Sequence, residues 1–179
     1  MDNGLIPRRY AKALYKFALD KGETKNIYDL SKEVIKAFQS NPDLQKVLSN
    51  PFVASEDKEK LLLSAAEDKN NEIYTQFIKL IISQKRVGYA YQMMLAYRDI
   101  YRNENNISQA RITTASKLDA GRMKKLRELV SRAFKDSTLE FSESVDPALI
   151  GGFVIDVDSV RMDASLSNEL EQLRQTLLS

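Results

Sequence analysis

The side chains that could do chemistry are restricted in this chain of 179 residues, because it contains neither histidine nor cysteine. The absence of histidine removes the usual general base near neutral pH and the commonest zinc ligand. Together the two absences exclude Ser-His-Asp and Cys-His catalysis, disulfide bonds and thiolate metal sites. An enzyme built on this sequence would have to use carboxylate, lysine, tyrosine or serine side chains, with or without magnesium.

Two short motifs resemble ligand-binding sequences but lack the residues that such sites need. Gly151-Gly152 continues into an apolar strand pattern, whereas a phosphate-binding P-loop continues into Gly-Lys-Ser/Thr and a helix. Asp156 and Asp158 are spaced like metal ligands, yet no third and fourth oxygen ligand stands at a suitable spacing. We interpret the glycines as allowing a bulge or a close backbone approach, and the aspartates as turn residues.

The segment 122–135 is the strongest argument for an anionic ligand. Its basic residues lie around an apolar stripe, as on any solvated helix, and apart from Phe134 near its end no aromatic residues for base stacking are interleaved with them. The whole chain has 27 Lys and Arg against 25 Asp and Glu, an excess too small for a dedicated nucleic-acid-binding protein. An acidic protein partner is the favoured interpretation, and no catalytic, cofactor or metal site is predicted. The basic residues are Arg122, Lys124, Lys125, Arg127, Arg132 and Lys135.

The elements that must position these residues are helical in the first part of the chain. From Pro7 to about Arg102 the apolar residues recur at intervals of three and four, which is typical of amphipathic helices. Gly22 and two Asn-Pro pairs mark breaks between helices, and Ser55 is predicted to be the N-cap of a later one. The pattern predicts a compact bundle of about six helices joined by short loops.

From residue 107 the pattern becomes that of strands. Ile107–Ala115, Leu139–Val145 and Ile150–Val157 are predicted strands, because β-branched and aromatic residues alternate or cluster in them. Asp119 is the predicted N-cap of the helix that follows the first strand. We therefore predict an α+β chain with a helical domain at residues 1–105 and an alpha+beta domain at residues 106–179, joined by a hinge near 103–106. The closing helix carries a stripe of Leu166, Leu170, Leu173 and Leu177.

The sequence contains no stretch of about 18 uncharged apolar residues, so direct insertion into a membrane is not expected. Arg8-Arg9 matches the charged start of a twin-arginine export signal. Lys12, Lys16 and Asp20, however, interrupt the apolar region that such a signal needs. We expect a soluble, cytoplasmic protein.

Blocks spread along the whole chain resemble one protein family. The first block runs from Arg8 to Ala18, and the last runs from Asp146 to Ile155 and continues into Met162 to Ser165. Between them, Leu48 to Phe52 and Lys58 to Leu62 follow the same pattern. In order, length and domain break, the chain resembles the delta subunit family of F-type ATP synthase, which includes the mitochondrial oligomycin-sensitivity-conferring protein. The absence of a transit peptide favours the bacterial member of the family.

The resemblance implies a non-catalytic stator subunit, present in one copy per complex. The family's N-terminal six-helix bundle sits on the catalytic head and receives the N-terminal amphipathic helix of an alpha subunit. Contact with the beta subunits is left open. The family's C-terminal domain meets subunit b of the peripheral stalk, at the cytoplasmic face of the bacterial inner membrane. The stator stops the head turning with the rotor, so that rotation driven by ions is coupled to ATP synthesis.

The resemblance places the alpha-subunit helix in a groove between the first and fifth helices of the bundle. Small residues such as Ala11, Ala13 and Ala18 would let a partner helix approach closely. The same side chains could equally be internal core, since periodicity does not separate these cases. The expected groove residues are Tyr10, Ala13, Leu14, Phe17, Phe77, Leu80, Ile81 and Gln84.

The stalk-side domain carries the other set of family residues. The family usually reads Asp-Gly-Ser where this chain has Ala164 between Asp163 and Ser165. If that turn requires a positive φ angle, Ala164 would add strain of about 1 kcal/mol. The turn from Asp158 to Arg161 also departs from the common pattern. The matching motif residues are Asp146, Pro147, Leu149, Ile150, Gly151, Gly152, Asp163 and Ser165.

Two rival classes of function remain open from the residues alone. One is an adaptor that binds nucleic acid through the basic segment 122–135, and the other is a metal-dependent enzyme that uses only carboxylates. Neither class explains the ordered matches at both ends of the chain. The stator function, with no nucleic-acid partner, is therefore the prediction.

Overall fold

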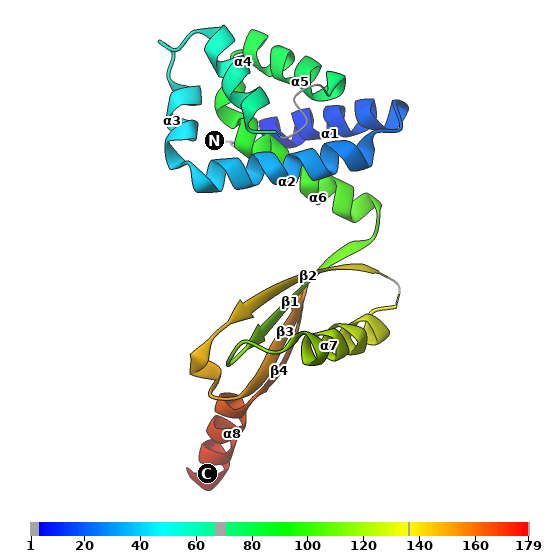
Figure 1. Ribbon diagram of the computed structural model, residues 1–179, viewed down its shortest axis with the longest axis vertical. Coiled ribbons are helices and arrows are strands. Elements are labelled where there is room, and N and C mark those ends of the chain that lie inside the picture. Colours follow the sequence, from blue (N-terminus) through cyan, green and yellow to red (C-terminus); the bar gives the residue numbers. More distant parts are fainter. Residues whose placement is uncertain (1–3, 67–70, 136, 179) are drawn as a thin grey trace. The chain divides into compact units, whose positions relative to one another are not determined.

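The computed structural model describes residues 4–66, 71–135 and 137–178, and it is α+β, as the sequence predicts. The chain divides into two compact units, Met1–Glu104 and Asn105–Ser179, and each is described here by itself. Helices make up the described part of the first unit, and a sheet with two longer helices makes up the second (Figure 1).

The first unit is built around α6. This helix packs along both α1 and α2, while α4 packs mainly against α5. The elements are α1 (Leu5–Asp20), α2 (Thr24–Ser40), α3 (Pro42–Ser49), α4 (Ser55–Ser64), α5 (Glu72–Ser83), the short 3-10 helix η1 (Val87–Tyr89) and α6 (Ala90–Glu104).

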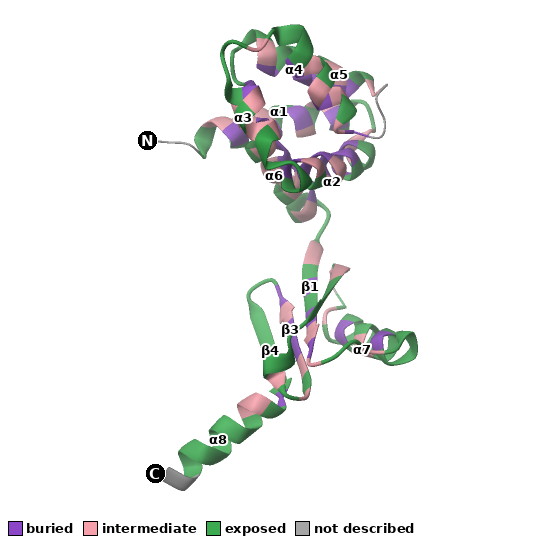
Figure 2. Cartoon of the chain, turned by 60° about the vertical axis from the view of Figure 1, so that its left-hand side comes forward, coloured by how far each residue is buried: buried purple, intermediate pink, exposed green. Residues whose placement is uncertain are grey.

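The core of the first unit lies where α6 meets α1 and α2. Met93, Met94 and Tyr97 of α6 are buried there, and the inward faces of the helices form the purple interior of Figure 2. The Tyr97 hydroxyl donates a hydrogen bond to the Thr24 carbonyl at 3.0 Å. This bond satisfies the one polar group that Tyr97 brings into the core.

The start of α4 differs from the sequence-based expectation. Ser55 was predicted to be the N-cap, but it is the first residue inside α4, and Ala54 holds the N-cap position without a side-chain hydrogen bond. Glu56 and Asp57 lie in the first turn, where their negative charges interact favourably with the positive end of the helix dipole. The prediction was wrong by one residue, which is the usual uncertainty of a helix boundary.

The second unit contains a four-stranded sheet in the order β2-β1-β3-β4. Strand β1 pairs parallel with β2 through the crossover helix α7, whereas β3 pairs antiparallel with both β1 and β4. The elements are β1 (Ile107–Thr114), α7 (Ala120–Ala133), β2 (Thr138–Val145), the short 3-10 helix η2 (Pro147–Leu149), β3 (Gly152–Val157), β4 (Val160–Ser165) and α8 (Leu166–Leu178).

Helix α7 covers one face of this sheet and closes a second core. Asp119 caps the helix as predicted, since its side chain accepts a hydrogen bond from the Arg122 amide at 2.9 Å. Leu118, on the other side of the cap, packs against the same core. The buried members of this core are Ala110, Ile112, Met123, Val130, Ile155 and Val157.

Strand β4 is the one strand of the described sheet that the sequence analysis did not identify. Its residues are exposed except for Ser165, so it lacks the buried alternation that marks the other strands. Ala164 lies in this strand and is not among the residues with positive φ, so the strain considered for it does not arise. Asp158 in the preceding turn does have a positive φ, of 48°.

No helix in the described part of the chain is both long enough and apolar enough to cross a bilayer.

Candidate partner-binding surfaces

A groove lies between α1 and α5, with a volume of about 280 Å³. Four of its residues come from α1 at helical spacing, so they share one face of that helix. The other three come from α5. The lining residues are Tyr10, Ala13, Leu14, Phe17, Gln76, Phe77 and Leu80.

The lining residues divide into a floor and an accessible rim. Leu14 and Phe77 are buried and close the floor, where they also belong to the core of the unit. Ala13 is exposed, and Leu80 is 45% exposed although it is a large apolar side chain. An apolar groove with an exposed leucine at its edge suits an apolar helix face better than it suits water.

Some residues expected at the groove lie elsewhere. Ile81 is 1% exposed and packs in the core, while Gln84 is exposed just beyond the end of α5; neither lines the groove. Gln76, which the sequence analysis did not name, does line it. Ala11 and Ala18 are fully buried, so of the three alanines considered only Ala13 is on the groove surface.

The family motif of the second unit gathers where η2, β3, β4 and α8 meet. The Asp146 side chain accepts a hydrogen bond from the Ala148 amide at 3.0 Å and so starts η2. The Gly151 amide then donates to the Leu149 carbonyl at 2.7 Å, closing a tight turn in which Ile150 has a φ of 64°. The Gly151 carbonyl accepts from the Leu166 amide, which ties this turn to the start of α8.

The two glycines of the motif allow a close backbone approach, as predicted. A Cβ atom on Gly152 would stand 2.0 Å from the Ala164 carbonyl oxygen, and Gly152 has a φ of 72°. A Cβ atom on Gly151 would stand 2.5 Å from the Leu166 side chain. Both glycines therefore bring β3 and the turn before it against the β4–α8 junction, and neither forms a phosphate loop.

Asp163 and Ser165 fix the first turn of α8. The Ser165 hydroxyl donates to the Asp163 carboxylate at 2.6 Å, and the Ser165 amide donates to the same oxygen at 3.0 Å. These two hydrogen bonds from Ser165 lower the pKa of Asp163. The Asn168 amide in turn donates to the Ser165 hydroxyl oxygen at 3.2 Å. These hydrogen bonds therefore fix the residue at which α8 begins.

Helix α8 presents an apolar stripe that the described part of the chain leaves uncovered. Leu166, Leu170 and Leu173 are all exposed, and Leu170 is exposed by 55%. Figure 2 shows α8 green along nearly all of its described length. The sequence analysis identified this stripe. Its fourth member, Leu177, has a side chain that the structure does not describe. Leucines at this spacing on one exposed helix face are typical of a surface that binds another helix.

The candidate charged sites do not form a reaction centre. Asp158 accepts a hydrogen bond from the Gln109 amide at 3.1 Å, which is turn chemistry. Within the described residues, no group of three or more acidic side chains could hold a metal ion. On α7, Arg127 forms an ion pair with Glu143, and Arg122 lies 3.2 Å from Asp119. The basic face is therefore partly neutralised by neighbouring carboxylates.

Comparison with known proteins gives one consistent result. The family model described as ATP synthase delta (OSCP) subunit matches residues 6–177. ATP synthase subunit delta of Parabacteroides distasonis is 37% identical over 99% of this chain and 98% of its own length. The protein of the same name from Phocaeicola vulgatus is 33% identical over 98% of this chain and 95% of its own length.

A solved structure shares the fold. A chain of the Toxoplasma gondii mitochondrial ATP synthase hexamer superposes with a TM-score of 0.70, covers 97% of both chains and is 17% identical. The family model and the relatives each extend over nearly the whole sequence, so both units are included in the match. The chain belongs to the ATP synthase delta (OSCP) subunit family.

Proposed function

We propose that this chain, a structural and non-catalytic subunit of F-type ATP synthase, links the catalytic head to the peripheral stalk through two separate surfaces. One surface is the α1–α5 groove of the first unit. The other is the exposed leucine stripe of helix α8 in the second unit. The match of the family model across residues 6–177 supports the role. The assignment of the head-side contact to the first unit rests on the apolar groove between α1 and α5.

The head-side partner in this proposal is the N-terminal amphipathic helix of an alpha subunit. Its apolar face would pack over Leu80 and Phe17, and Ala13 would leave room for the approach of the partner backbone. A helix laid over the groove would bury on the order of 800 Å² per partner, the area of an ordinary stable interface. The floor is already closed by Leu14 and Phe77, so little of the binding free energy is lost to ordering.

The stalk-side partner is subunit b. Helix α8 offers it the exposed side chains of Leu166, Leu170 and Leu173 on a helix whose start is held by Ser165 and Asp163. A fixed start means that the stripe is presented in one direction from the sheet of its own unit. Packing of such a stripe against helical partners follows the usual rules of helix association.

The remaining parts of the proposal follow the family. We assign residues 1–105, with helices α1 to α6 as a six-helix bundle, to the head, and residues 106–179 to the stalk. One copy per complex would lie at the cytoplasmic face of the bacterial inner membrane. There it would keep the head from turning with the rotor. Contact with the beta subunits would extend the head interface.

The test is calorimetric titration of the full chain with a peptide from the N-terminus of the same organism's alpha subunit. One-to-one binding is expected, and Leu80→Asp should weaken it by at least about tenfold, since the change puts a charge on an apolar contact. Leu19→Asp is the matched control, because Leu19 is an exposed leucine of α1 that does not line the groove. Unaltered binding by a folded Leu80→Asp variant would refute the groove as the docking site.

A further inference from the structure

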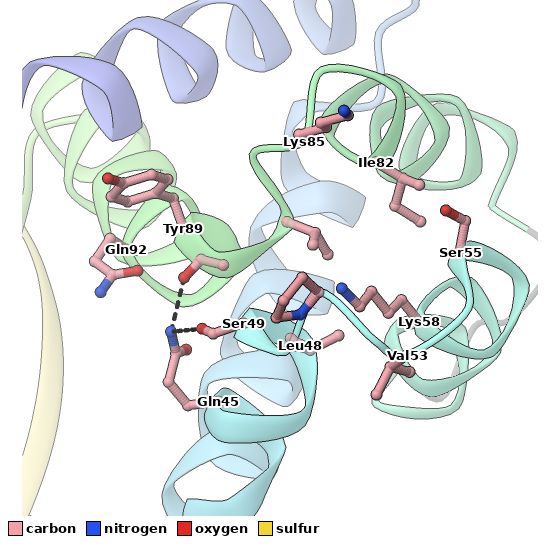
Figure 3. Close-up of a pocket in the computed structure, with 13 residues that line it drawn as sticks. Gln45, Leu48, Ser49, Val53, Ser55, Lys58, Ile82, Lys85, Tyr89 and Gln92 are labelled. Carbon is pink, nitrogen blue, oxygen red and sulfur yellow. Dashed lines mark hydrogen bonds between the residues drawn. The ribbon is translucent and has the colours of Figure 1, made fainter.

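A second concavity of about 640 Å³ lies on the first unit, between α3, α4, the end of α5 and the start of α6 (Figure 3). None of its lining residues belongs to the α1–α5 groove. Its walls are formed by Leu48, Val53, Ile82 and Val87, with Gln45 and Gln92 toward its edge. Gln45 is already engaged, because its side-chain amide donates to the Gly88 carbonyl at 2.7 Å.

The unusual residue in this concavity is Lys58. Its side chain runs from α4 into the space that Figure 3 displays, and the residue is only 8% exposed. Across residues 4–66, 71–135 and 137–178, nothing forms an ion pair or a hydrogen bond with its amino group. Lysine is seldom enclosed to this degree: the aliphatic stem of Lys58 is packed, while its amino group keeps contact with solvent. An anion that enters the concavity can therefore reach that group.

The charge of the lining favours an anion. Lys58 and Lys85 both line the concavity, and among the residues that the structure describes no aspartate or glutamate does. Asp57 and Glu59 adjoin Lys58 in α4, but neither lines the concavity, and Glu59 pairs with Lys79 at 3.9 Å. Ser55 adds a hydroxyl that can donate to a carboxylate beside Lys58. A carboxylate placed here would gain a charge-assisted hydrogen bond in a partly water-excluded site.

The loop that lines the concavity also carries an exposed apolar side chain. Phe52 stands in the loop between two lining residues, Pro51 and Val53, and is 95% exposed. Its amide donates to the Asn50 side chain at 2.9 Å, so a local turn holds the loop at this point. An exposed phenylalanine on the loop that lines the same concavity as Lys58 fits a ligand that carries an apolar group next to its carboxylate.

We propose that this concavity is a second peptide-binding site, which takes a glutamate or aspartate side chain at Lys58 and an adjoining apolar side chain at Phe52. The proposal does not rest on the α1–α5 groove or on the stator function. Within it, Lys58 supplies the specificity for charge and Phe52 adds contact area. The site would therefore prefer an acidic residue next to an aliphatic one.

The experiment titrates the full chain with N-acetyl-glutamyl-leucinamide and follows amide shifts by NMR at constant ionic strength. We expect saturable shifts at Ser55, Val87 and Gly88, with a Kd on the order of 1 mM for so small a probe. The neutral analogue N-acetyl-glutaminyl-leucinamide should bind about tenfold more weakly or worse, as expected for the loss of one charge-assisted hydrogen bond. This comparison of two ligands needs no variant protein.

Two variants assign the effect to Lys58. Lys58→Met keeps the length and apolar stem of the side chain, so the protein should stay folded while glutamyl binding weakens by about tenfold or more. Lys60→Met is the matched control, because Lys60 is an exposed lysine of the same helix that does not line the concavity. Equal binding of the two dipeptides, or unchanged binding by Lys58→Met, would overturn the proposal. If glutarate binds as tightly as the glutamyl dipeptide, the claim that the site binds peptides is overturned, and the concavity is a site for free carboxylates.

Discussion

Replacing Gly152 with alanine should destabilise the second unit far more than replacing its neighbour Gly151. The new Cβ at position 152 would lie 2.0 Å from the Ala164 carbonyl oxygen, a backbone atom of the paired strand that cannot rotate away. The φ of 72° adds roughly 1–2 kcal/mol for an L-residue. Disturbance of the ladder where Gly152 faces Ser165 adds about 1 kcal/mol per lost hydrogen bond. The expected loss is about 3 kcal/mol.

Gly151→Ala provides the matched comparison. Its Cβ would meet the Leu166 side chain at 2.5 Å, but the atom that it meets is the end of an exposed and rotatable leucine. A small side-chain rotation relieves that contact, so the expected loss of unfolding free energy is under about 1 kcal/mol.

The assay must report on the second unit alone, because two compact units need not unfold together. Urea unfolding followed by the NMR signals of Ile112 and Ile155, both buried in that unit's core, meets this requirement. The midpoint should fall strongly for Gly152→Ala and little for Gly151→Ala. Similar losses for the two variants would refute the account of the close approach at the β3–β4 junction.

Four further substitutions have expected outcomes. Ile81→Ala should lower the unfolding free energy of the first unit by about 3 kcal/mol, whereas Leu80→Ala should change it by less than about 0.5 kcal/mol; thermal unfolding of both distinguishes core from groove. Tyr97→Phe should lose about 1 kcal/mol in urea unfolding, because the Thr24 carbonyl loses its hydrogen bond. The lowered pKa of Asp163 stabilises the fold above the pKa of about 3.9 in the unfolded chain, and this contribution is lost as pH falls through the folded value. The Tm of Asp163→Asn should therefore fall less steeply in this acid range, and an identical pH profile would contradict the assignment.

The sequence predicted those elements whose buried faces have a clear period. Helices of the first unit repeat apolar residues every three or four positions, and Ala110 and Ile112 alternate in β1, so burial can be inferred directly. The N-cap at Asp119 was predictable because Leu118 and Met123 flank it on both sides. Ser55 had no such flanking signal, which explains the error of one residue at α4.

What remained hidden depends on contacts between segments that are distant in sequence. Strand β4 has no buried alternation, and only its pairing with β3 makes it a strand. The burial of Lys58 arises because α3, α4 and η1 converge around it, and a lysine in the first turn of a helix gives no sign of this. At the α1–α5 groove, the sequence of α5 is apolar around most of the helix, so periodicity did not separate Leu80 from Ile81. Only packing shows that Leu80 is exposed and Ile81 is buried.

The connection between the units has a mechanical consequence. Only residues 105 and 106 separate the end of α6 from the start of β1, and the Asn106 carbonyl already accepts a hydrogen bond from the Thr138 amide. A pulling force that enters through this connection acts along β1, a central strand bonded to β2 on one side and β3 on the other. Because the ladder bonds run across the strands, such a force loads many of them in shear at once instead of peeling them apart singly. The second unit should therefore resist a sustained force applied along β1 better than an equal force that pulls the edge strand β4 away from the sheet.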